Sequence, residues 1–254
     1  MNLTVVIPTR DRLDPLRRTV ASILETVVNP PPILVLHDAP QEPASIEWSS
    51  RSPSLEAIEF RTKHSLTALW NQAILRSKTE WVCICNDDLV FKAGWTDYLQ
   101  EAIASGRFRQ VNLSSYAAFC LHKSFVPLLG WFDERFTSGY YEDVDWQLRI
   151  SESRLEGFLD YSHDHRFVEH TKTVGHGSPA WDWQENIRWF CRKWGRENYT
   201  DWNKPSYREK PEVDWYPEIT ALYVSAFGVT NRITEINAQV GARHPVFPTR
   251  DRTN

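Results

Sequence analysis

The sequence of 254 residues lacks features that several classes of protein require. No apolar run approaches the ~20 residues of a membrane-spanning helix, so we expect no membrane span. Four cysteines are too few for a disulfide scaffold and suit a reducing compartment. No basic segment followed by an apolar one opens the chain, so we expect no secretory signal and a cytoplasmic location. Because Lys and Arg (29) nearly balance Asp and Glu (33) without a basic block, nucleic acid is not an expected partner.

Glycine is missing from the first loop, where one class of nucleotide enzyme needs it. Residues 3–7 (LTVVI) form an apolar strand, and residues 8–12 (PTRDR) follow it as a loop without glycine. Sugar-phosphate nucleotidyltransferases cradle a triphosphate in a glycine-rich loop at this point. The sequence therefore disfavours that class, which is kept as an alternative.

Apolar strands alternate with amphipathic helices along the first half of the chain. Strands are predicted at 3–7, 33–36 and 81–85, and helices at 14–27, 65–74 and 95–103. Asp14 is expected to cap the first of these helices, with Pro15 in its first position, and Ser65 to cap the second. The pattern predicts an α/β fold with a largely parallel sheet, in which ligands bind at the carboxyl ends of the strands.

The strand at 81–85 runs directly into Asn86, Asp87 and Asp88. Adjacent carboxylates repel each other unless water or a cation separates them. A divalent cation shared with an anionic ligand would make the arrangement favourable, so the stretch is a candidate metal–phosphate site. The alternative is a solvated turn, since Asn and Asp are ordinary turn residues.

A second acidic cluster, Glu142, Asp143 and Asp145, opens a predicted helix whose Val144 and Leu148 are expected to face the core. The positive end of the helix dipole stabilises such anions, so a purely structural cluster is the alternative. Four histidines follow, and one at the end of a strand is a candidate metal ligand. They are His163, His165, His170 and His176.

Many of the twelve tryptophans lie from Trp181 onward, which sets the C-terminal part of the chain apart. A helix is predicted from residue 182, and shorter helices are predicted from 217 and 231. In the first of these, Phe190 and Trp194 lie on an apolar face, and Arg188, Arg192 and Lys193 are expected elsewhere.

The motifs, taken in order, resemble glycosyltransferase family 2 of the GT-A fold. The resemblance rests on VVIPTRDR at 5–12, Asp38, NQAI at 71–74, NDD at 86–88, FDERF at 132–136, EDVD at 142–145 and a Lys-Trp-Gly ending at 193–195. It covers roughly residues 1–195. The sequence departs from the family pattern at Asn86, where an Asp is usual, and at His37, where an Asp-Asp pair is usual.

The resemblance implies a GT-A catalytic domain over residues 1–180, with a mixed sheet flanked by helices. A nucleotide-binding half would cover about 1–90 and an acceptor half about 91–180, and residues 181–254 would form a helical, Trp-rich extension packed on the core. It also implies site residues. Those expected to bind the donor are Pro8, Thr9, Arg10, Asp38, Asn71 and Asp87.

Three further roles follow from the resemblance. Asp88 would hold Mn²⁺ or Mg²⁺, with His170 or, alternatively, His176 helping the metal or the diphosphate. Asp143 would be the catalytic base. On the acceptor side, Trp131 would bind the acceptor. Glu142 and Asp145 would either bind the acceptor or position the helix.

The activity implied is inverting transfer of a sugar from a nucleotide-diphosphate donor, with a UDP-sugar as the default, to a hydroxyl of a glycan or another acceptor. Inversion follows because a single base without a nucleophilic carboxylate gives one displacement. The alternative from another class is a non-catalytic carbohydrate-binding protein, whose tryptophans would stack on sugars.

Overall fold

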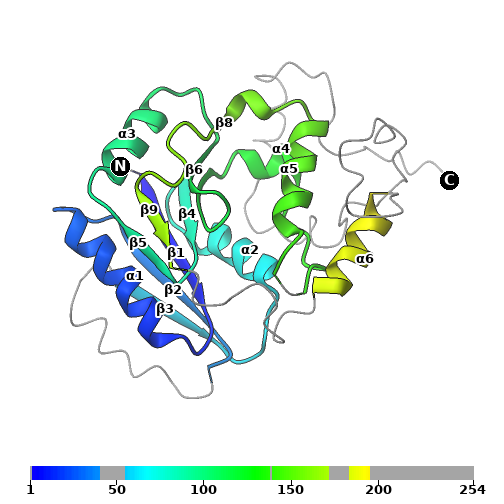
Figure 1. Ribbon diagram of the computed structural model, residues 1–254, viewed down its shortest axis with the longest axis horizontal. Coiled ribbons are helices and arrows are strands. Elements are labelled where there is room, and N and C mark those ends of the chain that lie inside the picture. Colours follow the sequence, from blue (N-terminus) through cyan, green and yellow to red (C-terminus); the bar gives the residue numbers. More distant parts are fainter. Residues whose placement is uncertain (1, 41–54, 138, 172–182, 195–254) are drawn as a thin grey trace.

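The computed structural model describes residues 2–40, 55–137, 139–171 and 183–194, and a seven-stranded mixed sheet forms its centre (Figure 1). The strand order is β3-β2-β1-β4-β7-β6-β8. The four parallel strands are β1 (Leu3–Thr9), β2 (Ile33–Asp38), β3 (Leu55–Phe60) and β4 (Trp81–Cys85). The others are β7 (Ala118–His122), antiparallel to β4 and β6, then β6 (Gln110–Ser114) and β8 (Leu159–Asp160), which are parallel to each other.

A second, small sheet pairs β5 (Leu89–Phe91) with β9 (Val168–His170) in antiparallel register. Helices α1 (Leu13–Thr26) and α3 (Trp95–Ala104) cover one face of the main sheet. Helices α2 (Leu66–Arg76), α4 (Phe125–Leu129) and α5 (Glu142–Glu152) cover the other. A short 3-10 turn spans Glu156–Phe158, and α6 (Trp183–Lys193) lies beside α5 (Figure 1). The predicted α/β fold with strands at 3–7, 33–36 and 81–85 is confirmed.

Alternating side chains of the strands fill two separate cores. Val5 points into the core beneath α1 and α3, and its neighbour Val6 points into the core beneath α2 and α5. Cys83, Cys85 and Cys120 are free and buried in the first core, where they pack as small apolar side chains. In β1, β2 and β4 both faces are therefore largely apolar, and the polar side chains lie near the strand ends.

The helix starts agree with the sequence in one case and differ in another. Ser65 caps α2, with its Oγ accepting from Ala68 N at 3.1 Å, as expected. The expected cap of α1 is wrong, because Arg12 holds the N-cap position and makes no side-chain capping bond. Asp14 lies in the first turn, and Pro15 follows it there, where its missing N–H costs nothing.

Val144 and Leu148 do not join either core of the sheet. They pack against a third cluster, formed by Phe136, Phe190 and Trp194, between α5 and α6. Among the described residues, no helix is long and apolar enough to cross a membrane. The helices expected after residue 217 lie outside the described residues.

The loop between β4 and β5 is fastened to α1 by a buried hydroxyl. Thr19 Oγ1 lies 2.9 Å from the carbonyl oxygens of Asp87 and Leu89 and accepts from Leu89 N at 2.9 Å. Thr19 is fully buried. One side chain of α1 thus holds the backbone on both sides of Asp88.

Replacing this hydroxyl by a methyl group in Thr19→Val should lower the free energy of unfolding by about 1–3 kcal/mol, because a buried N–H loses its acceptor. Urea denaturation would measure the loss. Thr62→Val, at an exposed position, is the matched control and should change stability little. Equal stability of the Thr19 variant and the wild type would contradict the anchoring role.

Candidate active site

Polar residues at the ends of β1 and β2 meet those of the loop after β4 at the carboxyl edge of the sheet. The register pairs Thr9 with His37, so the ends of β1 and β2 lie side by side. Thr9 Oγ1 donates to Asp87 Oδ2 at 2.6 Å, which joins the end of β1 to the loop after β4. Five of the six residues expected to hold a donor, all except Asn71, thus come together at one edge, as a parallel sheet dictates.

Asp38, at the end of β2, is fully buried and surrounded by donors. Its Oδ2 forms an ion pair with Arg10 Nη2, and its Oδ1 lies 2.9 Å from both His64 N and His64 Nδ1. The Arg10 side chain stays 40% exposed, so it can still meet a ligand. His64 was not anticipated, because its tie to Asp38 depends on where α2 begins.

The acidic pair after β4 shares one guanidinium. Arg12 Nη1 lies 2.8 Å from Asp87 Oδ1, and Arg12 Nη2 lies 3.1 Å from Asp88 Oδ2. Burial raises the pKa of Asp87, while the Thr9 hydrogen bond and the Arg12 charge oppose that rise. Sequence reasoning gave Arg12 no role, although its spacing two residues after Arg10 in the first loop was a usable signal.

Of the four histidines singled out, His170 lies at the acidic pair. Its Nε2 is 3.0 Å from Asp88 Oδ1. The pairing of β5 with β9 sets Leu89 opposite His170, and Thr171 N donates to Asp88 O at 2.9 Å. The other two described histidines lie elsewhere, His163 against Tyr98 and His165 against Ser114, and His176 lies outside the described residues.

Asp88 and His170 offer a divalent cation an oxygen and a nitrogen donor. Within the described ranges no group of three or more His, Cys, Asp or Glu side chains is placed to hold a metal ion. Mg²⁺ binds through one or two carboxylates, several waters and the phosphates of its substrate, so a two-donor protein site fits an ion that a diphosphate accompanies.

Asp143 lies in the first turn of α5, behind a strained stretch of backbone. Tyr140 and Tyr141 adopt positive φ angles of 80° and 73°. Tyrosine rarely adopts this conformation, which persists at functional sites when the surroundings enforce it. The half-buried Asp143 accepts from Val144 N at 2.8 Å, and burial raises its pKa.

Glu142 is more deeply buried than Asp143. Burial, and next the charge of Asp143, raise the pKa of Glu142 well above its ordinary value. Its Oε2 has no hydrogen-bond partner among the residues that the structure describes. Asp143 is therefore the member of the pair that ionises more readily and is open to a ligand.

The two residues before β7, Tyr116 and Ala117, each interact with one of the acidic clusters. Asn86 N donates to Ala117 O at 2.8 Å, so the loop after β4 touches the residue before β7. The preceding residue, Tyr116, has its pKa raised by burial first and by the nearby Asp143 charge among the further causes. The loop after β4 thus contacts Ala117, and the charge of Asp143 acts on the neighbouring Tyr116.

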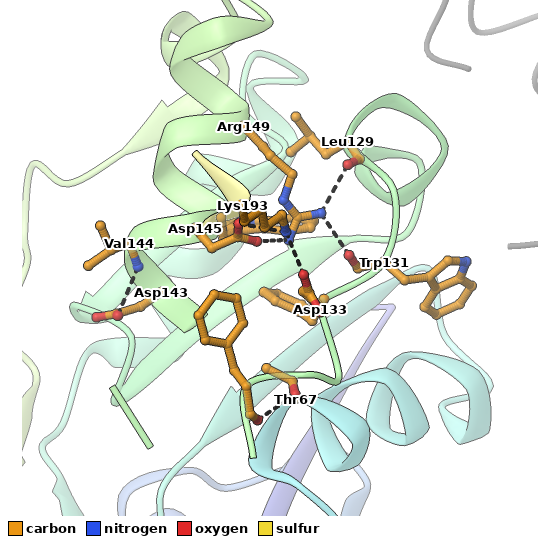
Figure 2. A network of polar contacts seen from close by, with 12 residues as sticks. Thr67, Leu129, Trp131, Asp133, Asp143, Val144, Asp145, Arg149 and Lys193 are labelled. Carbon is orange, nitrogen blue, oxygen red and sulfur yellow. Dashed lines mark hydrogen bonds and ion pairs between the residues drawn. The ribbon is translucent and has the colours of Figure 1, made fainter. Parts of the chain in front are cut away.

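A buried ion network joins α5, α6 and the loop after α4 (Figure 2). Lys193 Nζ lies 2.7 Å from both Asp133 Oδ2 and Asp145 Oδ1, and Arg149 Nη2 lies 2.9 Å from Asp145 Oδ2. The expectation that Lys193 lies away from the packed face is wrong, because two buried carboxylates draw its ammonium inward, leaving the residue 3% exposed.

The model of "Glycosyl transferase family 2" matches residues 4–162. The chain belongs to glycosyltransferase family 2. The match includes every described element from β1 to β8, and it ends before β9 and α6.

The similar proteins are distant or uncharacterised. An uncharacterized protein, y4gI of Sinorhizobium fredii, is 32% identical over 110 residues, which are 40% of this chain and 12% of that protein. The structure of S. aureus TarS 1-349 superposes with a TM-score of 0.55 at 12% identity, over 68% of this chain and 61% of that 1-349 chain. The chain thus spans less than two thirds of either protein, and the TarS likeness supports the GT-A fold alone.

In this family 2 chain, three residues that were expected to contact a ligand form bonds to other groups of the protein. Asn71 is fully buried, and its amide bonds Phe132 N and O at 3.0 Å each and Glu134 Oε1 at 2.8 Å. Asp145 is fully buried and forms ion pairs with Arg149 and Lys193. Trp131 is 8% exposed, and its carbonyl accepts from Arg149 Nη1 at 2.7 Å.

The raised pKa of Glu142 makes a prediction about stability. The unfolded chain releases this proton near the ordinary value of 4.5, before the folded protein does, so the native state loses stability as the pH rises from 4.5 to the folded pKa. Glu142→Gln should therefore raise the free energy of unfolding at pH 7 by about 1 kcal/mol or more. The gain should shrink toward pH 4.5.

Denaturant unfolding at several pH values would measure the gain, with Glu101→Gln, at an exposed position of α3, as the control. A Glu142 variant less stable than the wild type at pH 7 would show that the ionised side chain is not a cost to the fold.

Proposed function

We propose that the chain is an inverting glycosyltransferase that moves a sugar from a nucleotide-diphosphate donor to an acceptor hydroxyl in the cytoplasm. The observation that carries the proposal is the buried acidic pair at the carboxyl edge of the sheet, with Asp88 beside His170. Asp143, in the first turn of α5, is the candidate base. The family membership of residues 4–162 supports the same reaction.

The nucleotide would lie along the ends of β1 and β2. Pro8 and Thr9 line the end of β1, and the exposed Arg10 guanidinium orients Asp38, which would accept from the base. Asp87, held by Thr9 and Arg12, would contact the ribose or the donor sugar. A uridine base is the default, and a donor contact of Asn71 stays a prediction.

Asp88 and His170 would hold Mn²⁺ or Mg²⁺, which neutralises charge that develops on the leaving diphosphate. Arg12 forms ion pairs with Asp87 and Asp88 and places a further positive charge at the same edge of the sheet. These side chains fix the diphosphate before the reaction, so the charge that forms meets groups that need no reorganisation.

Asp143 would accept the proton of the acceptor hydroxyl as that oxygen attacks the anomeric carbon from the side opposite the diphosphate. Its raised pKa makes it a stronger base than an exposed Asp. The neighbouring Glu142, with a pKa well above its ordinary value, is a poor nucleophile. One displacement without a covalent intermediate inverts the anomeric centre.

The test of function is release of nucleotide from UDP, GDP, dTDP and CMP sugars, with and without Mn²⁺. Slow release from one donor supports the transferase, and sugar binding without release supports the carbohydrate-binding alternative. Asp88→Ala should abolish the metal-dependent part of nucleotide binding, as measured by calorimetry, because Asp88 supplies the carboxylate. Asp97→Ala, on the exposed face of α3, is the control, and normal Mn²⁺-dependent binding by the Asp88 variant would rule out the metal assignment.

Asp143→Asn should bind donor nearly as well as the wild type and turn over ~10²-fold more slowly or worse, because the carboxamide cannot take the proton. In the wild type, kcat/KM should fall on the acid side through a pKa raised above 3.8. Steady-state kinetics across pH would measure both effects. Unchanged turnover in the Asn variant would remove Asp143 as the base.

A further inference from the structure

Helix α6 lies beyond the segment that the family model matches, yet it fastens the backbone that leads to Asp143. The Asn186 side chain is fully buried. Its Oδ1 accepts from Thr137 N at 3.1 Å, and its Nδ2 donates to Tyr140 O at 2.9 Å and to Gly139 O at 3.3 Å. One carboxamide thus bonds backbone groups at both ends of a short stretch before α5.

This stretch is the strained one. Positive φ angles at Tyr140 and Tyr141 are unfavourable for tyrosine and persist only where surrounding contacts enforce them. Asn186 supplies such contacts directly to the Tyr140 carbonyl. Without them the backbone before Glu142 could relax, and the first turn of α5 would move with it.

The other end of α6 holds α5 two residues beyond Asp143. Lys193 Nζ bridges Asp133 and Asp145 (Figure 2). Trp194, the residue after α6, donates through Nε1 to Asp145 Oδ1 at 3.0 Å. Within α6, Trp189 Nε1 donates to Asp133 Oδ2 at 3.2 Å. Asp143 is therefore flanked on the N-terminal side by a residue tied to Asn186 and on the C-terminal side by one tied to Lys193.

We propose that α6 belongs to the catalytic unit, and that Asn186 and Lys193 are positioning residues that fix the first turn of α5 and hence Asp143. The inference rests on the proposed function for the role of Asp143. Neither residue touches the reacting atoms, so both act through the backbone of 137–145. Placing a base to within ~0.5 Å requires such support, since a displacement of about 1 Å can cost 10²-fold in rate.

The test uses the full chain with Asn186→Asp, Asn186→Ala and Lys193→Met. The Asp variant keeps the shape and the acceptor oxygen of Asn186 but loses both donors and turns an oxygen toward two carbonyls. Lys193→Met keeps most of the length and removes the charge. Arg192→Ala, an exposed residue of the same helix, is the matched control.

Two readouts separate positioning from general damage. Hydrogen exchange measured by mass spectrometry should be about tenfold faster over 137–150 in the Asn186 and Lys193 variants, and unchanged over β1, β2 and α2. For the donor that the nucleotide-release screen identifies, kcat should fall ~10²-fold while KM stays within about twofold, because the donor residues lie on other elements. Arg192→Ala should match the wild type in both.

Wild-type exchange over 137–150 in both Asn186 variants would overturn the proposal. Hydrogen exchange in the variants that is equally faster over 137–150, β1, β2 and α2 would also overturn it, because that pattern marks a purely structural role. A variant that does not fold counts as this second outcome. A wild type that releases nucleotide from no donor would instead refute the proposed function, and the exchange pattern would still decide whether α6 fixes α5.

Discussion

The cost of burying carboxylates governs this site. A buried anion needs a cation or several donors, and five acidic residues in and around the site have a cation of their own or share one. Asp38 has Arg10, Asp87 and Asp88 share Arg12, and Asp133 and Asp145 share Lys193. These cations come from the first loop and from the far end of the described chain, so the charge requirement ties distant segments to one edge of the sheet.

Glu142 and Asp143 are the exception. Among the described residues no basic side chain forms an ion pair with either, and burial raises the pKa of both. Anions left without a cation in a fold that otherwise supplies one are costly, which is a property expected where basicity serves a reaction. The nearby strain at Tyr140 and Tyr141 adds to this cost. The rest of the fold, chiefly α6, has to hold what would otherwise relax.

The sequence predicted what depends on local pattern. The parallel strands, the Ser65 cap and the placement of Asn86, Asp87 and Asp88 after β4 follow from periodicity and from turn chemistry. Of the two histidines that the resemblance offered beside Asp88, His170 lies there, and His176 lies outside the described residues. These features need only a few neighbouring residues to specify them.

What the sequence could not predict are the tertiary partners of charged side chains. Arg12 was one cation in an exposed loop, and its pairing with Asp87 requires that β1 and β4 be adjacent. Lys193 occupies a helix position that periodicity assigns to solvent, and the carboxylates of Asp133 and Asp145 reverse that assignment. Asn186 gave no signal, because its partners are backbone groups whose positions arise only in the folded chain.

Charge arithmetic at the donor edge indicates how the proposed metal and diphosphate would depend on each other. Asp87 and Asp88 carry two negative charges against the single positive charge of Arg12, a net of −1, while Asp38 and Arg10 cancel. A divalent cation would make this edge positive by one charge, which suits an anionic diphosphate. A diphosphate alone would meet a negative edge, and an ion alone would find only Asp88 and His170 as donors. Each ligand therefore supplies what the other lacks, so under the proposed function the two should bind together rather than in turn.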